Sequence, residues 1–193
     1  PGTDEAARQE ARAAIARRLG HIETELADGR SYWITGEAAR ADVQTLRAES
    51  CAVLTGIGTV LADNPRLNVR AFPTLRQPAR IVLDSKLQTP LGSHMISDDL
   101  SPTVIVTAVD DEERLKPYRA FNHIRILRSS ENAAGRIDLA ALLPQLADLG
   151  YGELMVEAGA TLTSAFIEAG LADEIVLYQA SKILGEGKSL LTL

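Results

Sequence analysis

Short runs of apolar residues alternate with amphipathic segments along most of the chain. The continuous runs predict buried strands at residues 52–55, 80–83, 103–107, 124–127, 153–157 and 174–179. Apolar residues at helical spacing predict helices at residues 4–19, 36–49, 111–118, 137–149 and 161–168. Strands that alternate with helices indicate an α/β domain, with a mostly parallel sheet that helices cover on both faces.

Local signals set the expected ends of these helices. Thr35 is the expected N-cap of the second helix, and Gly159 precedes the last one. Pro117 is expected to end the third helix, because proline inside a helix removes a hydrogen bond. The first helix has acids at its start and arginines at its end, which suits the helix dipole. Its apolar face is mostly alanine, so we expect it to pack on a neighbour or another subunit.

Composition narrows the class of protein. The 193 residues are 46% apolar and 4% aromatic, which fits one globular domain with an aliphatic core. A net charge of −6 argues against a general nucleic-acid binder but leaves room for an anionic small ligand. The single cysteine excludes an intramolecular disulfide. No apolar run approaches the ~20 residues of a membrane span, and no secretory signal is seen, so we expect a cytoplasmic protein without a membrane partner.

Two predicted strands end in turns that contain glycine. Residues 156–162 leave a strand, pass Gly159 and enter a helix, and residues 55–59 repeat the arrangement with Gly56 and Gly58. Glycine there lets a ligand approach backbone amides, and a helix N-terminus favours phosphate. Such glycines are also common in any α/β protein, and the G-x-G-x-x-G fingerprint is absent. Two of them in one sheet indicate an extended ligand such as a dinucleotide.

Charged residues beside these strand ends are candidates for ligand contacts. Glu157 follows a strand at the edge where α/β proteins bind ligands; the alternative is a solvated carboxylate. Arg47 and Arg70 flank the first predicted strand and suit a phosphate as a pair, whereas each alone would be a surface arginine. At Ser85 and Lys86 a hydroxyl beside an ammonium would hold a 2′-phosphate and favour NADPH over NADH. An ordinary polar turn is the alternative there.

Several catalytic signatures are absent from the chain. It lacks the H-x-E and P-C-x-x-C motifs of zinc deaminases, the G-x-S-x-G elbow, the P-loop and H-E-x-x-H. Three scattered histidines and one cysteine predict no metal site. Taken alone, Asp63 is a turn or cap residue before Asn64 and Pro65, and Trp33 is a core or hinge aromatic.

Five segments of the chain resemble, in order and spacing, the reductase domain of the bacterial riboflavin-biosynthesis deaminase/reductase. They are SYWITGEAARADVQTLR, AVLTGIGTVLADNPRLNVR, RIVLDS, VEAGATLTSAFIEAGLADEIVLY and KILGEG, and the resemblance covers residues 26–193. It implies a dihydrofolate-reductase-like fold, with a mixed, mostly parallel sheet flanked by helices. It also implies an oxidoreductase that uses NADPH to reduce 5-amino-6-(5-phosphoribosylamino)uracil to the ribitylamino product, by hydride transfer to C1′ of the opened sugar.

The resemblance implies roles for individual residues of this chain. It implies a substrate site, with the arginines suited to the ribose phosphate, made of Ser31, Arg47, Leu67, Arg70 and Glu157. Glu157 is also the implied catalytic carboxylate, which would hydrogen-bond the substrate and assist proton movement. The implied cofactor site consists of Trp33, Thr59, Asp63, Ser85, Gly159, Ala160, Thr161, Leu162, Thr163, Ser164 and Ala165. No covalent nucleophile is needed.

The chain departs from that family at both ends. Residues 21–25 stand where the family has its first core strand and cannot form it in register, so residues 1–25 stay unplaced. The family's C-terminal strands are expected to be missing after residue 193. We expect a homodimer, and a zinc deaminase that is fused or separate. Two alternatives stay open: a reductase of the same fold for a pterin-like heterocycle, and a catalytically impaired nucleotide-binding module.

Overall fold

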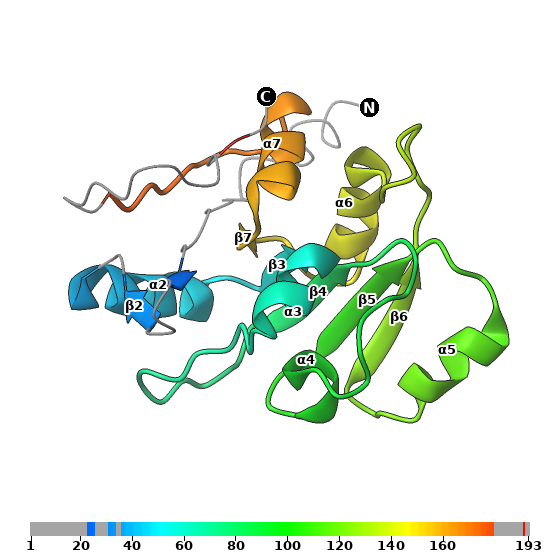
Figure 1. Ribbon diagram of the computed structural model, residues 1–193, viewed down its shortest axis with the longest axis horizontal. Helices are drawn as coiled ribbons and strands as arrows, with labels where there is room; N and C mark the ends of the chain where they lie inside the picture. Colours follow the sequence, from blue (N-terminus) through cyan, green and yellow to red (C-terminus); the bar gives the residue numbers. More distant parts are fainter. Residues whose placement is uncertain (1–22, 26–30, 34–35, 180–190, 192–193) are drawn as a thin grey trace, which may run out of the picture.

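A five-stranded parallel sheet organises the part of the chain that the structure describes. This computed structural model describes residues 23–25, 31–33, 36–179 and 191 (Figure 1). The strands are β3 (Ala52–Gly56), β4 (Ala79–Leu83), β5 (Thr103–Thr107), β6 (Ile124–Arg128) and β7 (Leu154–Val156), in the spatial order β6-β5-β4-β3-β7. All pairings between them are parallel, so their carboxyl ends share one edge. The expected α/β arrangement is confirmed.

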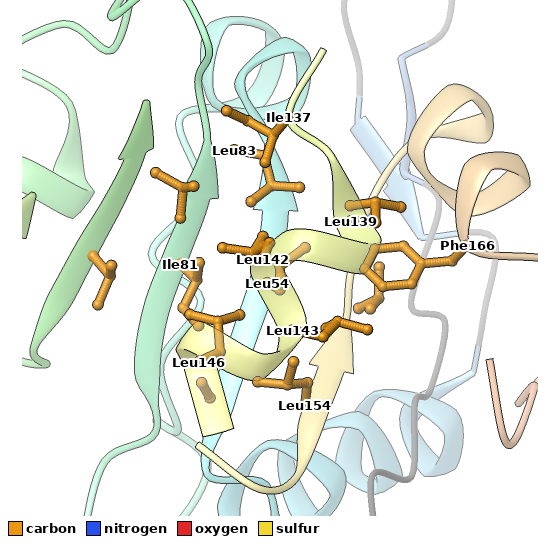
Figure 2. Close-up of a cluster of buried hydrophobic side chains, with 14 of the residues drawn as sticks. Leu54, Ile81, Leu83, Ile137, Leu139, Leu142, Leu143, Leu146, Leu154 and Phe166 are labelled. Carbon is orange, nitrogen blue, oxygen red and sulfur yellow. The ribbon is translucent and has the colours of Figure 1, made fainter. Parts of the chain in front are cut away.

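Helices cover both faces of this sheet. They are α2 (Glu37–Glu49), α3 (Ile57–Asp63), α4 (His94–Ser97), α5 (Glu112–Arg119), α6 (Leu139–Asp148) and α7 (Ala160–Glu168). On one face, Leu142 and Leu146 of α6 and Phe166 of α7 lie over Leu54 and Ile81 of the strands (Figure 2). Each of these side chains is at most 1% exposed, so each contributes roughly 1.5–3 kcal/mol of hydrophobic stabilisation.

The opposite face of the sheet packs against α2, α3, α4 and α5. There Val53 and Ile105 of the strands form one cluster with Leu46 of α2, Ile96 of α4 and Leu115 of α5. Successive residues of a strand point to opposite faces, so a strand covered on both sides needs an unbroken apolar run. This is why the strands are continuous in the sequence pattern rather than alternating.

The helices predicted within the described residues are confirmed, with differences at their ends. Gly36, not Thr35, is the N-cap residue of α2, and it makes no side-chain cap. Pro117 lies inside α5, which continues to Arg119 instead of ending at the proline. The buried side chain of Tyr118 anchors this last turn on the core, and tertiary packing outweighs the missing hydrogen bond. The predicted helix at residues 4–19 lies outside the described residues.

Two observed helices were not predicted, and one predicted strand is wrong. The glycines before and within α3 indicated a turn, but Val60 is 2% exposed and holds that helix on the sheet. Helix α4 is only four residues long and has no periodic signal. Residues 174–179 form no strand. Val176 and Tyr178 are half-buried while Ile175 and Leu177 are exposed, which is the alternation of a strand, but this backbone pairs with no described strand.

Two short strands near the N-terminus form a separate antiparallel pair. They are β1 (Glu23–Glu25) and β2 (Ser31–Trp33), with Thr24 opposite Tyr32. Strand β1 pairs with β2 and is not part of the five-stranded sheet.

Candidate functional site

A cleft of about 1700 Å³ runs along the carboxyl ends of β3, β4 and β7. Its walls come from α2, α3, the loop at residues 64–70, the loop before α6 and the first turns of α7. Ligands of open α/β sheets bind at this edge, which makes the cleft the candidate site. Most of the predicted site residues line it: Arg47, Thr59, Asp63, Leu67, Arg70, Ser85, Glu157, Gly159, Ala160, Thr161, Leu162, Thr163 and Ala165.

Three predicted site residues are not placed on the cleft wall. Ser164 lies in α7 but is 2% exposed and is not among the residues that line the cleft. Ser31 and Trp33 belong to β2, and their side chains are not among those that the structure describes. The predicted roles of all three stay predictions.

A buried ion pair forms part of the cleft wall. The Nε of Arg47, in the last turn of α2, donates to Oε1 of Glu157 at 2.6 Å, and its Nη2 donates to Oε2 at 2.7 Å. A third donor, Nη1 of Arg47, bonds the backbone carbonyl of Asn68 at 3.0 Å. Arg47 and Glu157 are each 7% exposed. This parallel two-point geometry is the strongest form of arginine–carboxylate contact.

The electrostatics of Arg47 follow from this pairing. Burial by itself lowers the pKa of the Arg47 guanidinium, because a charge is costly to remove from water. The charge of Glu157 and its hydrogen bonds raise the pKa, and together they outweigh burial, so the net shift is upward. The pair is therefore a fixed part of the folded site. Each carboxylate oxygen of Glu157 still has acceptor capacity beyond its bond to Arg47.

The loop between α3 and β4 is held in place at several successive residues. Val69 forms two hydrogen bonds with the side chain of Gln77, both at 2.8 Å, and the Arg66 side chain pairs with Asp98. Leu67 has a φ of +51° and is 3% exposed, so a buried leucine occupies a left-handed backbone conformation. Such backbone strain, of order 1–3 kcal/mol, persists only where surrounding contacts enforce the conformation, and it is common at functional sites.

Arg70 differs from Arg47 in the use of its side chain. Its backbone N–H donates to Oε1 of Gln44 at 2.8 Å, while its side chain is exposed in the cleft. The pKa of Arg70 is lowered overall, first by partial burial and then by the nearby guanidinium of Arg47. Glu157 opposes this shift, and Arg66 adds to it. Because these cations repel one another, a bound anion would be stabilised beside Arg70.

The first turn of α7 opens onto the cleft directly after Glu157. Its N-cap residue is Gly159, which makes no side-chain cap, so the first backbone N–H groups of the helix lack the usual N-cap acceptor. A Cβ built on Gly159 would meet nothing within 4 Å. The turn therefore offers open space beside amides that favour an anion.

Two further predicted residues come from helix α3, and another from the end of β4. Thr59 and Asp63 lie on α3, one turn apart, instead of in the turn expected from the sequence. Ser85 follows β4, and its hydroxyl donates to the carbonyl of Gly135 at 3.2 Å. This contact ties the loop before α6 to the cleft.

Sequence reasoning missed several residues of the site. Arg40 and Gln44 line the cleft from α2 beside Arg47. These three are polar residues at helical spacing, next to the apolar Val43 and Leu46, and that mixed face was a usable signal. Arg136 lines the cleft from the loop before α6, where the sequence offered no signal.

Within the described ranges, no group of three or more potential ligand side chains could hold a metal ion. None of the helices in those ranges has the length and hydropathy that a membrane span requires.

The profile of one protein family, described as the RibD C-terminal domain, matches residues 23–193. The chain belongs to the RibD C-terminal domain family. Among relatives, the riboflavin biosynthesis protein RibD of Escherichia coli strain K12 is 40% identical over 184 residues, which cover 88% of this chain and 48% of that protein. The 2,5-diamino-6-ribosylamino-4(3H)-pyrimidinone 5′-phosphate reductase of Archaeoglobus fulgidus is 36% identical over 152 residues, covering 74% of this chain and 67% of that protein.

A solved structure agrees with this membership. Acinetobacter baumannii RibD, form 1, superposes with a TM-score of 0.72 at 32% identity, covering 94% of this chain and 50% of that one. The predicted family and its dihydrofolate-reductase-like α/β fold are thereby confirmed. The chain spans about half the length of the RibD relatives that it matches.

Proposed function

We propose that this RibD C-terminal domain reduces 5-amino-6-(5-phosphoribosylamino)uracil to its ribitylamino product with NADPH, a step of riboflavin biosynthesis. The observation that carries the proposal is the carboxylate of Glu157, fixed by Arg47 in a cleft between an exposed arginine and an open helix N-terminus. Family membership and the names of the relatives support it. No side chain in this arrangement has to form a covalent bond to substrate.

At the substrate end of the cleft, we assign the phosphate to Arg70. Its guanidinium is exposed, whereas the fork of Arg47 is already engaged by Glu157. Leu67 closes the adjacent wall with its buried side chain. Arg47 therefore acts on the substrate through Glu157, and Ser31 stays a predicted contact.

The residues present suit a nicotinamide dinucleotide. The uncapped turn of α7 favours a phosphate, and the space beside Gly159 lets one approach the backbone. Thr59 and Asp63 on α3 and Ser85 after β4 line the same cleft, so polar contacts are available along its length. When bound, NADPH supplies the hydride for the reduction.

The chain's own residues position the reacting groups. Glu157 has acceptor capacity left for the hydroxyl or amine groups of the sugar, and Arg47 prevents its carboxylate from turning. Holding donor and acceptor carbons in contact lowers the barrier by removing their translational and rotational freedom. Glu157 is also placed to assist the proton movement that accompanies reduction.

The direct test measures loss of NADPH absorbance with the purified chain and freshly made substrate, generated by a separate deaminase. Oxidation that depends on the substrate is expected. A folded chain that binds NADPH without turnover would contradict the proposal and favour the nucleotide-binding module. Turnover with a pterin-like heterocycle in place of the phosphosugar would favour the other alternative.

The proposed partners follow from the same assignment. The RibD relatives extend well beyond the matched region, which leaves room for the zinc deaminase that would supply the substrate, fused or separate. The homodimer and the cytoplasmic location stay predictions. Sedimentation of the purified chain would test the first of these.

A further inference from the structure

The side chain of Gln44, on α2, has one end that is bonded and one that is not. It is 8% exposed and lines the cleft. Its Oε1 accepts a hydrogen bond from the backbone N–H of Arg70 at 2.8 Å. Because a backbone N–H can only donate, this bond fixes which end of the amide is the oxygen. The Nε2 group is the other end, and it forms no hydrogen bond with any residue that the structure describes.

The two N–H groups on Nε2 of Gln44 need an acceptor. Buried polar groups in native proteins nearly always have a hydrogen-bond partner, so each exception calls for an explanation. Nε2 is not among the described side-chain atoms that are fully enclosed without a partner, and it therefore reaches the open cleft. We infer that its acceptor belongs to the molecule that occupies the cleft.

The groups beside Gln44 indicate which kind of acceptor that is. Arg47 lies one turn further along α2, but its fork is engaged by Glu157. Arg70 is exposed in the cleft, and Arg47 and Arg66 already act on it as neighbouring cations. A neutral amide adds donors here without adding another positive charge. Guanidinium and amide N–H groups only donate, so this part of the cleft suits an oxygen that only accepts, such as that of a phosphate.

We propose that Gln44 is a further substrate-binding residue, whose Nε2 donates to the phosphate of the phosphosugar beside the guanidinium of Arg70. The inference rests on the proposed function, which places the phosphate at Arg70. The other end of the side chain has a separate role, because Oε1 holds the backbone of Arg70 at the cleft wall. One side chain therefore both positions the phosphate-binding arginine and supplies a donor of its own.

Two substitutions separate these two roles. Gln44→Glu keeps an oxygen that can accept from the Arg70 N–H but replaces the donor by an acceptor. Gln44→Lys keeps a donor but loses the acceptor. The measurement is kcat/KM for 5-amino-6-(5-phosphoribosylamino)uracil relative to kcat/KM for its dephosphorylated form, which gives the preference for the phosphate.

Gln44→Glu should reduce this preference about tenfold to a hundredfold, the range for a lost hydrogen bond to a charged group. Gln44→Lys should keep the preference but unfold at a lower urea concentration, because the backbone N–H of Arg70 loses its partner. A residue that only supports the loop would give the reverse pattern, with Gln44→Lys as the more harmful change to the preference.

Gln77→Glu is the matched control. Gln77 holds the residue next to Arg70, since its Oε1 accepts from the N–H of Val69 and its Nε2 donates to the carbonyl of Val69, both at 2.8 Å. Both ends of this amide are thus bonded within the protein, and Gln77 is not among the residues that line the cleft. Gln77→Glu should therefore change kcat/KM for the two substrate forms by the same factor and leave the preference as in wild type. Circular dichroism would confirm that each variant is folded.

Three results would overturn the proposal. The first is a preference that survives in Gln44→Glu, and the second is a preference that Gln77→Glu reduces as much as Gln44→Glu does. The third is an equal loss of kcat/KM for both substrate forms in Gln44→Glu, which would place the contact away from the phosphate.

The outcomes also separate this inference from the proposed function. If wild type reduces the phosphosugar but Gln44→Glu keeps the wild-type preference, the inference is wrong and the reductase assignment stands. If folded wild type reduces neither substrate form, the reductase assignment is wrong, and calorimetric titration with ribose 5-phosphate decides the inference. Binding that is at least tenfold weaker in Gln44→Glu than in wild type would support it. Equal affinity, or no binding to wild type, would overturn it.

Discussion

Replacing Arg47 by methionine should destabilise the folded chain by about 3–5 kcal/mol, the usual cost of leaving a buried charge without its partner. Methionine keeps most of the apolar stem and removes the guanidinium, so lost packing contributes little. The carboxylate of Glu157, which is 7% exposed with Arg47 beside it, would then lose its two short hydrogen bonds. Such a group must either take up a proton or keep a buried charge without its partner, and both cost free energy.

Urea denaturation of the single and double variants would measure this effect. Glu157→Gln alone should also destabilise, and the Arg47→Met/Glu157→Gln double variant should lose clearly less than the sum of the two single variants, because neither charge is left alone. Arg66→Met is the matched control. Arg66 also pairs with a carboxylate, but its side chain is 42% exposed, and exposed pairs contribute only about 0–1 kcal/mol.

Kinetics would show whether the pair acts as a unit. If Arg47 fixes Glu157, then Arg47→Lys and Glu157→Gln should lower kcat in the same way and be non-additive, since lysine keeps the charge but not the two-point geometry. If Arg47→Lys instead raises KM with kcat unchanged, Arg47 binds the substrate phosphate directly. That result, or a loss of 1 kcal/mol or less in Arg47→Met, would refute the reasoning.

Three further predictions address other parts of the structure. Arg70→Ala should raise the KM for the phosphosugar about tenfold to a hundredfold while kcat changes little, and an unchanged KM in the reductase assay would rule out its phosphate role. Arg80→Met should cost about 3–5 kcal/mol in urea denaturation, because Arg80 is fully buried and bonds Asp98 and the carbonyl of Ser101; a cost near zero would contradict this. Burial, then the charge of Asp84, raises the pKa of Tyr118 above 10.0 against an opposing Arg114. The contribution of Tyr118 to stability is therefore complete below pH 10.0 and is lost as the pH rises through the folded-state pKa. Tyr118→Phe should therefore flatten the fall in unfolding free energy above pH 10.0. An equally steep fall in the variant would argue against this role.

The local pattern of apolar residues was sufficient to predict the sheet and the helices that cover it. Short, continuous apolar runs such as Val104–Val106 predict strands that are buried on both faces of the sheet. Apolar residues at helical spacing, among them Leu142 and Leu146, predict α6. Glycine at the end of β7 indicated an open helix start. The motif around Glu157 indicated the site, because strand ends are where parallel sheets bind ligands.

Other features depended on contacts between distant residues. Helix α3 forms because Val60 packs on the sheet, although Gly56 and Gly58 indicate a turn. Residues 174–179 have the alternation of a strand but no described strand to pair with, and a strand needs a partner as well as a pattern. Pro117 remains inside α5 because burial of Tyr118 outweighs the tendency of proline to end a helix.

The division is clearest at Arg47. The sequence by itself determined that an arginine, a carboxylate and a glycine turn belong to one α/β edge. Only the tertiary structure decided that Arg47 bonds Glu157, 110 residues away, and leaves Arg70 exposed. Spacing along a chain reports which face of a helix or strand a residue occupies. The partner of a buried charge depends on which elements pack together, and that is set by the whole core.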